Sequence, residues 1–347
     1  MSEVLPTLIV GAGIAGMTAA HKLAKAGQSV VVLDKGRRPG GRMSTRVSRS
    51  GPTFDHGAQY LTARSVTFQQ ALQGWIDAGV AAEWDGRFVD LTEGETPTDT
   101  KRIAKRYVGT PGMSSVVGHL CDAAADVEAI DGPHFNVRVT ELKKTDTGWT
   151  ATDDAGKSHG PFSRVIVTIP APQARELLAE PAPQLAASLG EAVVSPTWTL
   201  MLAFEKPLEL WQPFDLGFID APDNECGSVA NNSSKPGRPS VADAGECWVV
   251  HGDSAWSTQH VEDKPDAVAA TLTAAFGRAI GRTLPTPTYA AAHRWRFANV
   301  VEPLGERWLY DADLGLGVCG DVCTAGSHTN IERAWLSALG LVEHMGG

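Results

Sequence analysis

The stretch from Thr7 to Asp34 constrains the fold more than any other part of the chain. It reads as an apolar run, three closely spaced glycines, an alanine-rich segment, a second apolar run and a terminal acid. Leu8 to Val10 predicts a buried strand and Gln28 to Leu33 predicts a second, parallel one, with a helix between them. Strand, tight turn, helix, strand and acid together form the unit that binds a dinucleotide by its pyrophosphate.

Each residue type in this unit has a physical role. Gly11 lets the chain turn sharply, Gly13 lets the backbone approach a pyrophosphate, and Gly16 lets the helix lie close to the strand. The helix N-terminus offers free N–H groups to the phosphates. Asp34 ends the second strand, where a carboxylate accepts hydrogen bonds from ribose hydroxyls. We therefore expect dinucleotide contacts from Gly11, Ala12, Gly13, Ile14, Ala15, Gly16, Asp34 and Lys35.

Composition limits the remaining possibilities. A chain of 347 residues is expected to hold one dinucleotide domain and one substrate domain. The formal net charge of −10 argues against a nucleic-acid partner, and no apolar run reaches the ~20 residues of a membrane span. No basic segment precedes the first apolar run, so a cytoplasmic location is expected. The cysteines form no CxxC pair, which predicts reduced, buried thiols and no metal site, with a disulfide between Cys319 and Cys323 as the alternative.

A second glycine motif follows the second strand. Residues 38–45 read Arg-Pro-Gly-Gly-Arg-Met-Ser-Thr, the pattern Arg-x-Gly-Gly-Arg-x-x-Ser/Thr without a mismatch. Its glycines permit another close backbone approach, and Arg42 offers a planar cation to the pyrophosphate. On these two linked motifs the chain resembles the amine-oxidase-like FAD superfamily. The resemblance implies noncovalently bound FAD, with Gly41, Arg42 and Met43 among its contacts.

The pattern Asp-x-Gly-Ala-Gln-Tyr at residues 55–60 narrows the resemblance. It is similar to the pattern in renalase and its bacterial relatives. Gly57 and Ala58 are small enough for the backbone to lie flat against an isoalloxazine ring, so Gly57, Ala58 and Gln59 are expected cofactor contacts. Gln59 and Tyr60 would project toward a ligand over the ring and are candidate catalytic residues. The histidine at the x position is interpreted as structural.

We expect an α/β fold, in which a Rossmann-type FAD-binding domain is interleaved with an α+β substrate domain built on an antiparallel sheet. The FAD-binding domain is predicted from residues 1–62, 105–175 and 297–347. The substrate domain is predicted from residues 63–104 and 176–296. The two domains thus exchange segments of one chain.

Within the substrate domain, strands alternate with a covering helix. Thr197 to Phe204 has the apolar run of a strand, and Asp266 to Ile280 has a helical period. Residues 220–245 are predicted as a long polar loop. Its Lys235 and Arg238 either face an anionic substrate from the rim of the active site or are simply solvated.

Two more candidate catalytic residues lie on predicted strands. Tyr289 to Asn299 alternates as a strand, with Arg294 and Arg296 on one face and Trp295 expected in the core. The Trp-Arg pair is similar to one in renalase, which makes Arg296 a candidate. His251 ends a strand in another matching region and is the second candidate.

The C-terminal region completes the expected cofactor site. Gly315 to Gly320 repeats GxGxxG, but no second strand and acid follow it, so it cannot form another nucleotide unit. The segment resembles the C-terminal flavin element of the superfamily. That resemblance implies that Asp321 binds the ribityl chain or lies near the pyrophosphate, and that the amides of Asn330 and Ile331 face the flavin. Asn330 is also expected to cap the final helix, and the backbone of Val139 is expected to hold the adenine.

The single dinucleotide site is used for FAD, so electrons must come from a substrate lying on the flavin and leave most simply to O2 as H2O2. The renalase resemblance implies oxidation of the 2- and 6-dihydro isomers of NAD(P)H to NAD(P)+. The expected partners are a dihydronicotinamide dinucleotide and O2, with no nucleic acid and no membrane. One alternative is an oxidase or desaturase of the superfamily acting on an amine or another small molecule. The other is a non-enzymatic flavin-binding protein.

Overall fold

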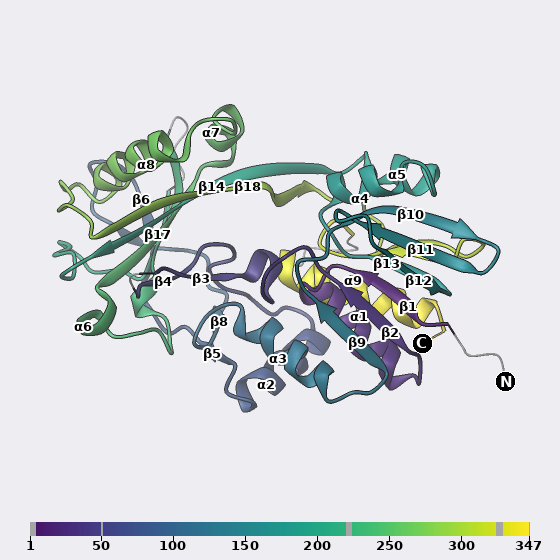
Figure 1. The fold of residues 1–347 in the computed structure, drawn as a ribbon. Coiled ribbons are helices and arrows are strands. Elements are labelled where there is room, and N and C mark those ends of the chain that lie inside the picture. Colours follow the sequence, from purple (N-terminus) through teal and green to yellow (C-terminus); the bar gives the residue numbers. More distant parts are fainter. Residues whose placement is uncertain (1–4, 50, 220–223, 324–328, 347) are drawn as a thin grey trace.

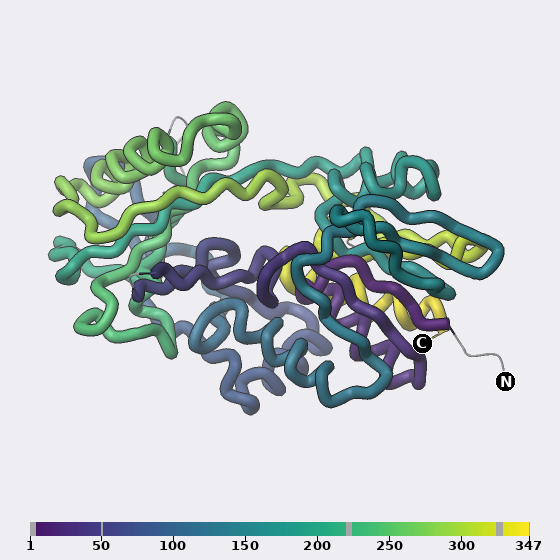
Figure 2. Tube along the Cα trace, viewed as in Figure 1, coloured from purple at the N-terminus to yellow at the C-terminus, as the bar shows by residue number. Residues whose placement is uncertain are grey.

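Two sheets built from interleaved parts of the chain organise the structure (Figure 1). The computed structural model describes residues 5–49, 51–219, 224–323 and 329–346. One sheet with its helices lies near both chain ends, and the other sheet forms the opposite end of the molecule. Two long paired strands, β14 (Val193–Phe204) and β18 (Tyr289–Glu302), run from the second sheet toward the first (Figure 2).

The first sheet confirms the Rossmann-type fold. Its strand order is β19-β20-β13-β1-β2-β9, and only the edge pair of β19 and β20 is antiparallel. Successive residues of the first strand point to opposite faces, so Ile9 packs on one side and Leu8 and Val10 on the other. The strands are β1 (Thr7–Val10), β2 (Val30–Leu33), β9 (Ile130–His134), β13 (Arg164–Val167), β19 (Leu309–Asp311) and β20 (Leu316–Val318).

Different elements cover the two faces of this sheet. Three helices pack on the Ile9 side: α1 (Ile14–Lys25), α3 (Ser115–Ala125) and α9 (Asn330–His344). The opposite face packs against a small antiparallel sheet and two short helices. These are β10 (Val139–Thr145), β11 (Gly148–Asp153), β12 (Ser158–Phe162), α4 (Ala171–Leu178) and α5 (Pro183–Leu189).

The second sheet has the order β18-β14-β17-β16-β15-β6-β7 and is antiparallel except between β15 and β6. One face is covered by α8 (Pro265–Ala279), whose Phe276 packs on Trp248 in a core that also contains Trp198. The opposite face receives Phe54, which packs on Met201. The remaining strands are β17 (Glu246–Gly252), β16 (Cys226–Asn231), β15 (Leu216–Ile219), β6 (Phe88–Leu91) and β7 (Thr98–Asp99).

Short elements connect the two sheets. The buried carboxylate of Glu332 in α9 accepts hydrogen bonds from the Ser65 amide and hydroxyl, and the Ser65 hydroxyl caps α2. The last helix therefore holds the start of α2 in place. The other short elements are α2 (Val66–Asp77), α6 (Val241–Ala244), α7 (Ser254–Gln259), β3 (Thr45–Val47), β4 (Thr53–Asp55), β5 (Ala81–Glu83), β8 (Tyr107–Gly109) and the 3-10 turns η1 (Gly41–Met43) and η2 (Asn232–Ser234).

The structure departs from the expected elements mainly in one segment. The predicted polar loop at residues 220–245 was wrong, because from residue 224 onward it contains β16, η2 and α6. Strand β16 consists of small and weakly apolar residues, yet it is hydrogen bonded on both sides by β15 and β17. Tertiary pairing thus overrides a weak local preference. The predicted domain boundaries stay a prediction, and β18 runs across the one at residue 296.

The close contact between the first strand and α1 gives a stability prediction. A Cβ added to Gly16 would lie 1.8 Å from the Gly11 carbonyl oxygen, whereas a Cβ on Gly13 would meet no atom within 4 Å. We expect Gly16→Ala to lower the free energy of unfolding by about 3 kcal/mol, although alanine normally favours a helix. Gly13→Ala is the matched control and should change it by about 1 kcal/mol or less. Urea unfolding of both variants in FAD-free form checks this without the contribution of bound cofactor, and equal stability would contradict it.

Candidate active site

The glycine loop forms an open cradle in front of α1. A Cβ added to Gly41, in the second glycine motif, would lie 3.6 Å from the Gly13 Cα, so the two motifs meet. The Asp34 carboxylate accepts hydrogen bonds from the amides of Ala12 (2.7 Å) and Gly36 (2.5 Å). These bonds fix the acid at the end of β2, where the sequence predicted a ribose contact.

The cradle is closed by an ion pair between the two ends of the chain. Both guanidinium Nη atoms of Arg42 donate to the Asp321 carboxylate, each at 2.6 Å. Arg42 also donates to the Ala298 carbonyl oxygen at 3.3 Å. Asp321 is only 5% exposed, whereas the Arg42 side chain is 29% exposed, so the carboxylate side of this bidentate pair is buried and the guanidinium side is partly open to water. The sequence predicted both residues as cofactor contacts, and the structure brings them together.

Arg333 is a cation of this region that the sequence did not reveal. It is 9% exposed and donates to the Asn330 side-chain oxygen, but its Nε has no hydrogen-bond partner in the part of the chain that the structure describes. Burial lowers the pKa of Arg333. The nearby carboxylate of Asp321 raises this pKa, and the nearby guanidinium of Arg42 lowers it. The signal available was an arginine in the first turn of a helix, where the dipole disfavours a cation. The cap of α9 is Thr329, so the predicted cap at Asn330 was wrong.

The segment after β4 extends the cradle toward the second sheet. The Ala58 amide donates to the Arg42 carbonyl oxygen at 2.9 Å. A Cβ on Gly57 would lie 2.1 Å from that same oxygen. Only glycine allows this approach, so the predicted flavin-contacting segment is attached directly to the dinucleotide motif.

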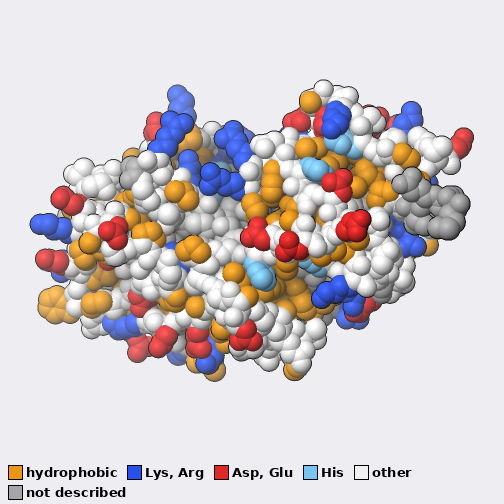
Figure 3. All heavy atoms as spheres, turned by 60° about the horizontal axis from the view of Figure 1, so that its bottom comes forward, with side chains coloured by type: hydrophobic (Ala, Val, Ile, Leu, Met, Phe, Trp, Pro, Cys, Tyr) orange, Lys and Arg blue, Asp and Glu red, His pale blue; other side chains and the backbone are white. Residues whose placement is uncertain are grey.

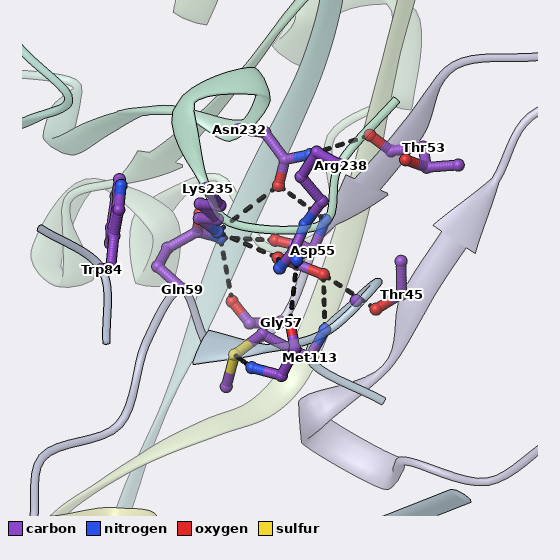
Figure 4. Close-up of polar contacts among 12 residues, drawn as sticks. Thr45, Thr53, Asp55, Gly57, Gln59, Trp84, Met113, Asn232, Lys235 and Arg238 are labelled. Atoms are coloured by element: carbon purple, nitrogen blue, oxygen red, sulfur yellow. Dashed lines mark hydrogen bonds and ion pairs between the residues drawn. The ribbon is translucent and has the colours of Figure 1, made fainter. Parts of the chain in front are cut away.

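A buried ion cluster lies behind this segment (Figure 4). One carboxylate oxygen of Asp55 accepts hydrogen bonds from Lys235 Nζ (3.0 Å) and Arg238 Nη2 (2.5 Å). The other accepts from the Thr45 hydroxyl (2.8 Å) and the Met113 amide (2.9 Å). Burial alone would raise the pKa of Asp55, but the two cations and the Met113 amide bring it down to about 2. We call Asp55, Lys235 and Arg238 the Asp55 cluster.

Neither cation of this cluster is solvated. The side chain of Lys235 is 0% exposed and that of Arg238 is 1% exposed, so both earlier interpretations, a solvated loop and an active-site rim, were wrong. Lys235 also donates to the Gln59 side-chain oxygen at 3.0 Å and lies 5.3 Å from the centre of the Trp84 ring. No local pattern reveals such a role, because their partner Asp55 is about 180 residues away.

Gln59 and His251 meet at the same place. Lys235 can only donate, so the Gln59 oxygen faces Lys235 and the amide nitrogen faces His251 Nε2 at 3.3 Å. An amide nitrogen only donates, so His251 Nε2 must accept, which places the imidazole proton on Nδ1. Burial, followed by the charge of Lys235, lowers the pKa of His251 to about 4. Two of the four predicted catalytic residues, Gln59 and His251, are therefore brought together as a neutral, oriented pair.

The inner face of the second sheet continues this polar surface. Thr199 pairs with His251 on one side and with His293 on the other, which places the three side chains in a row. The Thr199 hydroxyl is buried and has no partner among the described residues. His56 packs against the rings of His293 and Trp295, and the Trp295 Nε1 donates to the His56 carbonyl oxygen at 2.8 Å. Burial lowers the pKa of His56 to about 3, with His293 and Arg46 adding to the effect.

The structure does not bring Arg296 to this surface. Its guanidinium donates to Glu262 at 2.6 and 2.8 Å, and its side chain is 45% exposed. Tyr60 is half-buried, with the Arg106 guanidinium 5.2 Å from its ring centre. Of the other predicted contacts, Lys35 donates to Gln173, Met43 is buried in η1, Val139 begins β10, and Ile331 lies in the first turn of α9.

Comparison with known families decides the class of protein. Residues 84–344 match the family described as flavin containing amine oxidoreductase, and residues 9–75 match the NAD(P)-binding Rossmann-like domain. The first match covers more than half of the chain. The chain belongs to the flavin containing amine oxidoreductase family. Its cofactor is accordingly FAD.

Individual curated relatives match only short parts of the chain. The chain is 43% identical over 67 residues to a hydroxyneurosporene desaturase of Cereibacter sphaeroides, which is 19% of this chain and 13% of the relative. It is 30% identical over 105 residues to an L-amino acid dehydrogenase of Synechocystis, covering 26% of this chain and 22% of that one. The chain therefore spans less than a quarter of these curated relatives.

Solved structures share the fold over nearly the whole chain. A putrescine oxidase bound to putrescine superposes with a TM-score of 0.70 at 14% identity, covering 99% of both chains. An oxidoreductase from Methanosarcina mazei superposes with a TM-score of 0.73 at 11% identity, covering 98% of this chain and 100% of that one. At these identities the likeness concerns the fold.

The residues present fit FAD. Open space at Gly13 and Gly320, the start of α1 and the unpartnered Nε of Arg333 provide what a pyrophosphate requires. Asp34 would hold the adenosine ribose, and Asp321 the ribityl chain or a position near the pyrophosphate. Bound there, FAD supplies the capacity to accept hydride.

Among the described residues, no group of three or more His, Cys, Asp or Glu side chains is arranged to hold a metal ion, and no helix has the length and hydropathy needed to cross a membrane. All five cysteines are buried and free, as predicted. Acidic and basic side chains both occur across the face in Figure 3.

The ion pair in the cradle predicts how tightly FAD is held. Arg42→Ala removes a cation beside the pyrophosphate position and leaves Asp321 without its bidentate partner. We expect FAD to bind at least about tenfold more weakly, the loss that corresponds to one charge-assisted hydrogen bond. Arg278→Ala removes an exposed arginine on α8 that pairs with Glu225 and serves as the control. Flavin content after gel filtration measures the effect, and full retention in Arg42→Ala would contradict it.

The neutral histidines predict a dependence of stability on pH. The pKa values of His56 and His251 are lowered to about 3 and about 4 in the folded protein. An unfolded imidazole binds a proton near pH ~6.5, so below that pH the unfolded state holds more protons. The free energy of unfolding should therefore fall as pH falls from about 6.5 to about 4, by up to about 1.4 kcal/mol per pH unit for each imidazole.

Urea unfolding between pH 8 and pH 4.5 measures this slope. His251→Gln should reduce it, and the comparison at pH 8, where both imidazoles are neutral in the folded and unfolded states, separates out the change in packing. An unchanged slope in the variant would refute the assignment of His251 as a buried neutral group.

Proposed function

We propose that this flavoenzyme oxidises misreduced dihydronicotinamide dinucleotides. The substrates are the 2- and 6-dihydro isomers of NAD(P)H, which lose hydride to give NAD(P)+ while O2 is reduced to H2O2. One proton from solvent balances the overall reaction. The resemblance to renalase on residues 55–60 suggests this substrate, and the charge of the site supports it.

The observation that carries the proposal is the excess of buried positive charge in the Asp55 cluster. Asp55 faces both Lys235 and Arg238, and all three side chains are at most 1% exposed. The single carboxylate is thus outnumbered by two cations. Such a field attracts a ligand that carries phosphates and repels an ammonium ion. It therefore favours a dinucleotide over a cationic amine.

The chemistry also suits a site without a strong base. A dihydropyridine becomes aromatic when it loses hydride, so no N–H or O–H proton must be removed from it. His56 and His251 are neutral at physiological pH, and each is held by neighbours: Trp295 packs on the first, and Gln59 donates to the second. Gln59 and His251 would then orient the substrate ring and keep water away, with Tyr60 at its edge.

The second candidate is an oxidase or desaturase of the same family acting on an amine or another small molecule. The names of the relatives and of the putrescine oxidase favour it. Residues 324–330 contain no Phe, Tyr or Trp, so the sequence lacks such a ring at the place just before the final helix where amine oxidases have one. A third candidate, a flavin-binding protein without enzymatic activity, would require the ring face to be sealed.

Anaerobic stopped-flow reduction distinguishes these candidates. Mixing the FAD-loaded protein with 6-dihydro-NAD or 6-dihydro-NADP should bleach the flavin absorbance quickly, whereas β-NADH and putrescine should bleach it little. Fast bleaching by an amine with none by dihydropyridines would reject the proposed substrate. Slow bleaching by every compound would support the non-enzymatic candidate.

A further inference from the structure

The Asp55 cluster carries more positive than negative charge and lies directly behind the backbone that reaches the FAD cradle. We propose that it sets the electrostatic potential at the isoalloxazine, with Lys235 as a positioning residue that raises the reduction potential of bound FAD. The inference rests on the FAD site of the proposed function and is independent of which substrate is oxidised.

A continuous series of contacts links the cluster to the cradle. Lys235 bonds Asp55 and Gln59, which flank the Gly57–Ala58 segment on both sides. That segment bonds the Arg42 carbonyl oxygen, and Gly41 beside it meets Gly13. The ammonium of Lys235 is therefore fixed relative to the dinucleotide through short, buried bonds. A change of charge at Lys235 must therefore alter the electrostatic potential at the position of FAD.

The charges in this cluster do not cancel. One carboxylate faces an ammonium and a guanidinium, and the Thr45 hydroxyl and the Met113 amide complete its hydrogen bonds. All three ionised side chains are at most 1% exposed, so water screens the remaining positive charge poorly. A positive potential stabilises the negative charge that a flavin gains with two electrons.

Lys235 also contributes to the orientation of the neutral Gln59 and His251 side chains. Because its Nζ donates to the Gln59 oxygen, the Gln59 nitrogen is directed to the carbonyl oxygens of Asp55 and Gly57 and to His251 Nε2. The two carbonyl oxygens can only accept, so they favour the same orientation of the amide as Lys235 does. Lys235 thus adds to a preference that also fixes the tautomer of His251.

The titration of Lys235 offers a second way to change the charge. Burial, together with the charge of Arg238, lowers the pKa of Lys235 to about 8 despite the opposing effect of Asp55. The ionisable groups that face it are Asp55, Arg238 and His251. The pKa values of Asp55, about 2, and of His251, about 4, both lie below the range from pH 6.5 to 9.5. Trp84, Gln59 and Asn232 complete its surroundings and are neutral.

The experiment measures the flavin reduction potential of the purified holoenzyme and of Lys235→Met, which keeps the length of the side chain and removes its charge. We expect the potential to become more negative and the affinity for sulfite, read as bleaching of the visible spectrum, to fall by about tenfold, the equivalent of one pKa unit. Lys235→Arg should restore both values. Lys105→Met, which removes an exposed lysine paired with Glu83, should leave both unchanged.

Each outcome decides the inference. A Lys235→Met holoenzyme with wild-type potential and sulfite affinity overturns it, while the FAD site stands. Wild-type protein that binds no FAD rejects the proposed function instead. If Lys235→Met does not retain FAD, the potentials of wild type and Lys235→Arg are compared from pH 6.5 to 9.5. They should diverge above about pH 8, where lysine loses its charge and arginine does not, and parallel curves overturn the inference.

Discussion

The backbone carbonyl of Arg42 is the point on which the rest of the site depends. It accepts a hydrogen bond from the Ala58 amide and leaves no room for a side chain on Gly57. The guanidinium of the same residue donates two hydrogen bonds to the Asp321 carboxylate. Three segments that are remote in sequence thus meet at one residue: the second glycine motif, the segment after β4 and the end of β20. Any ligand that binds at the glycine loop contacts a surface whose three parts are already fixed to one another, so little ordering entropy is lost on binding.

The two sheets contribute different kinds of surface to the site, and the long strands β14 and β18 run from the second sheet toward the first. The first sheet presents the carboxyl ends of parallel strands, where helix N-termini and glycine loops bind a dinucleotide. The second presents the face of an antiparallel sheet, where residues paired across strands stand in rows. Thr199, His251 and His293 form one such row, and the Gly57–Ala58 segment lies between it and the cradle. A reactive ring would accordingly have a rigid backbone on one side and a replaceable set of polar side chains on the other.

Sequence reasoning succeeded where the physics is local. The turn at Gly11, the close approach at Gly16 and the helical period of α8 are each decided within a few residues, and the structure contains all three. It failed where the partner is remote. Lys235 and Arg238 sit in a polar segment that looks solvated, and only the fold brings them to Asp55, about 180 residues away. Arg333 gave only a weak signal, its unfavourable place in the first turn of a helix, and its role became evident only from its burial.

The Asp55 cluster is difficult to explain by stability. Removing three charged groups from water costs several kcal/mol for each ion, and apolar residues of similar size often stabilise a core as well or better. Asp55 could also have been neutralised by one cation, as Asp321 nearly is by Arg42, yet two fully buried cations approach it. A second cation adds repulsion that the fold must offset elsewhere. Its position behind the segment joined to the Arg42 carbonyl accounts for that cost, because a fixed positive potential there acts on a redox ring without requiring any group to move.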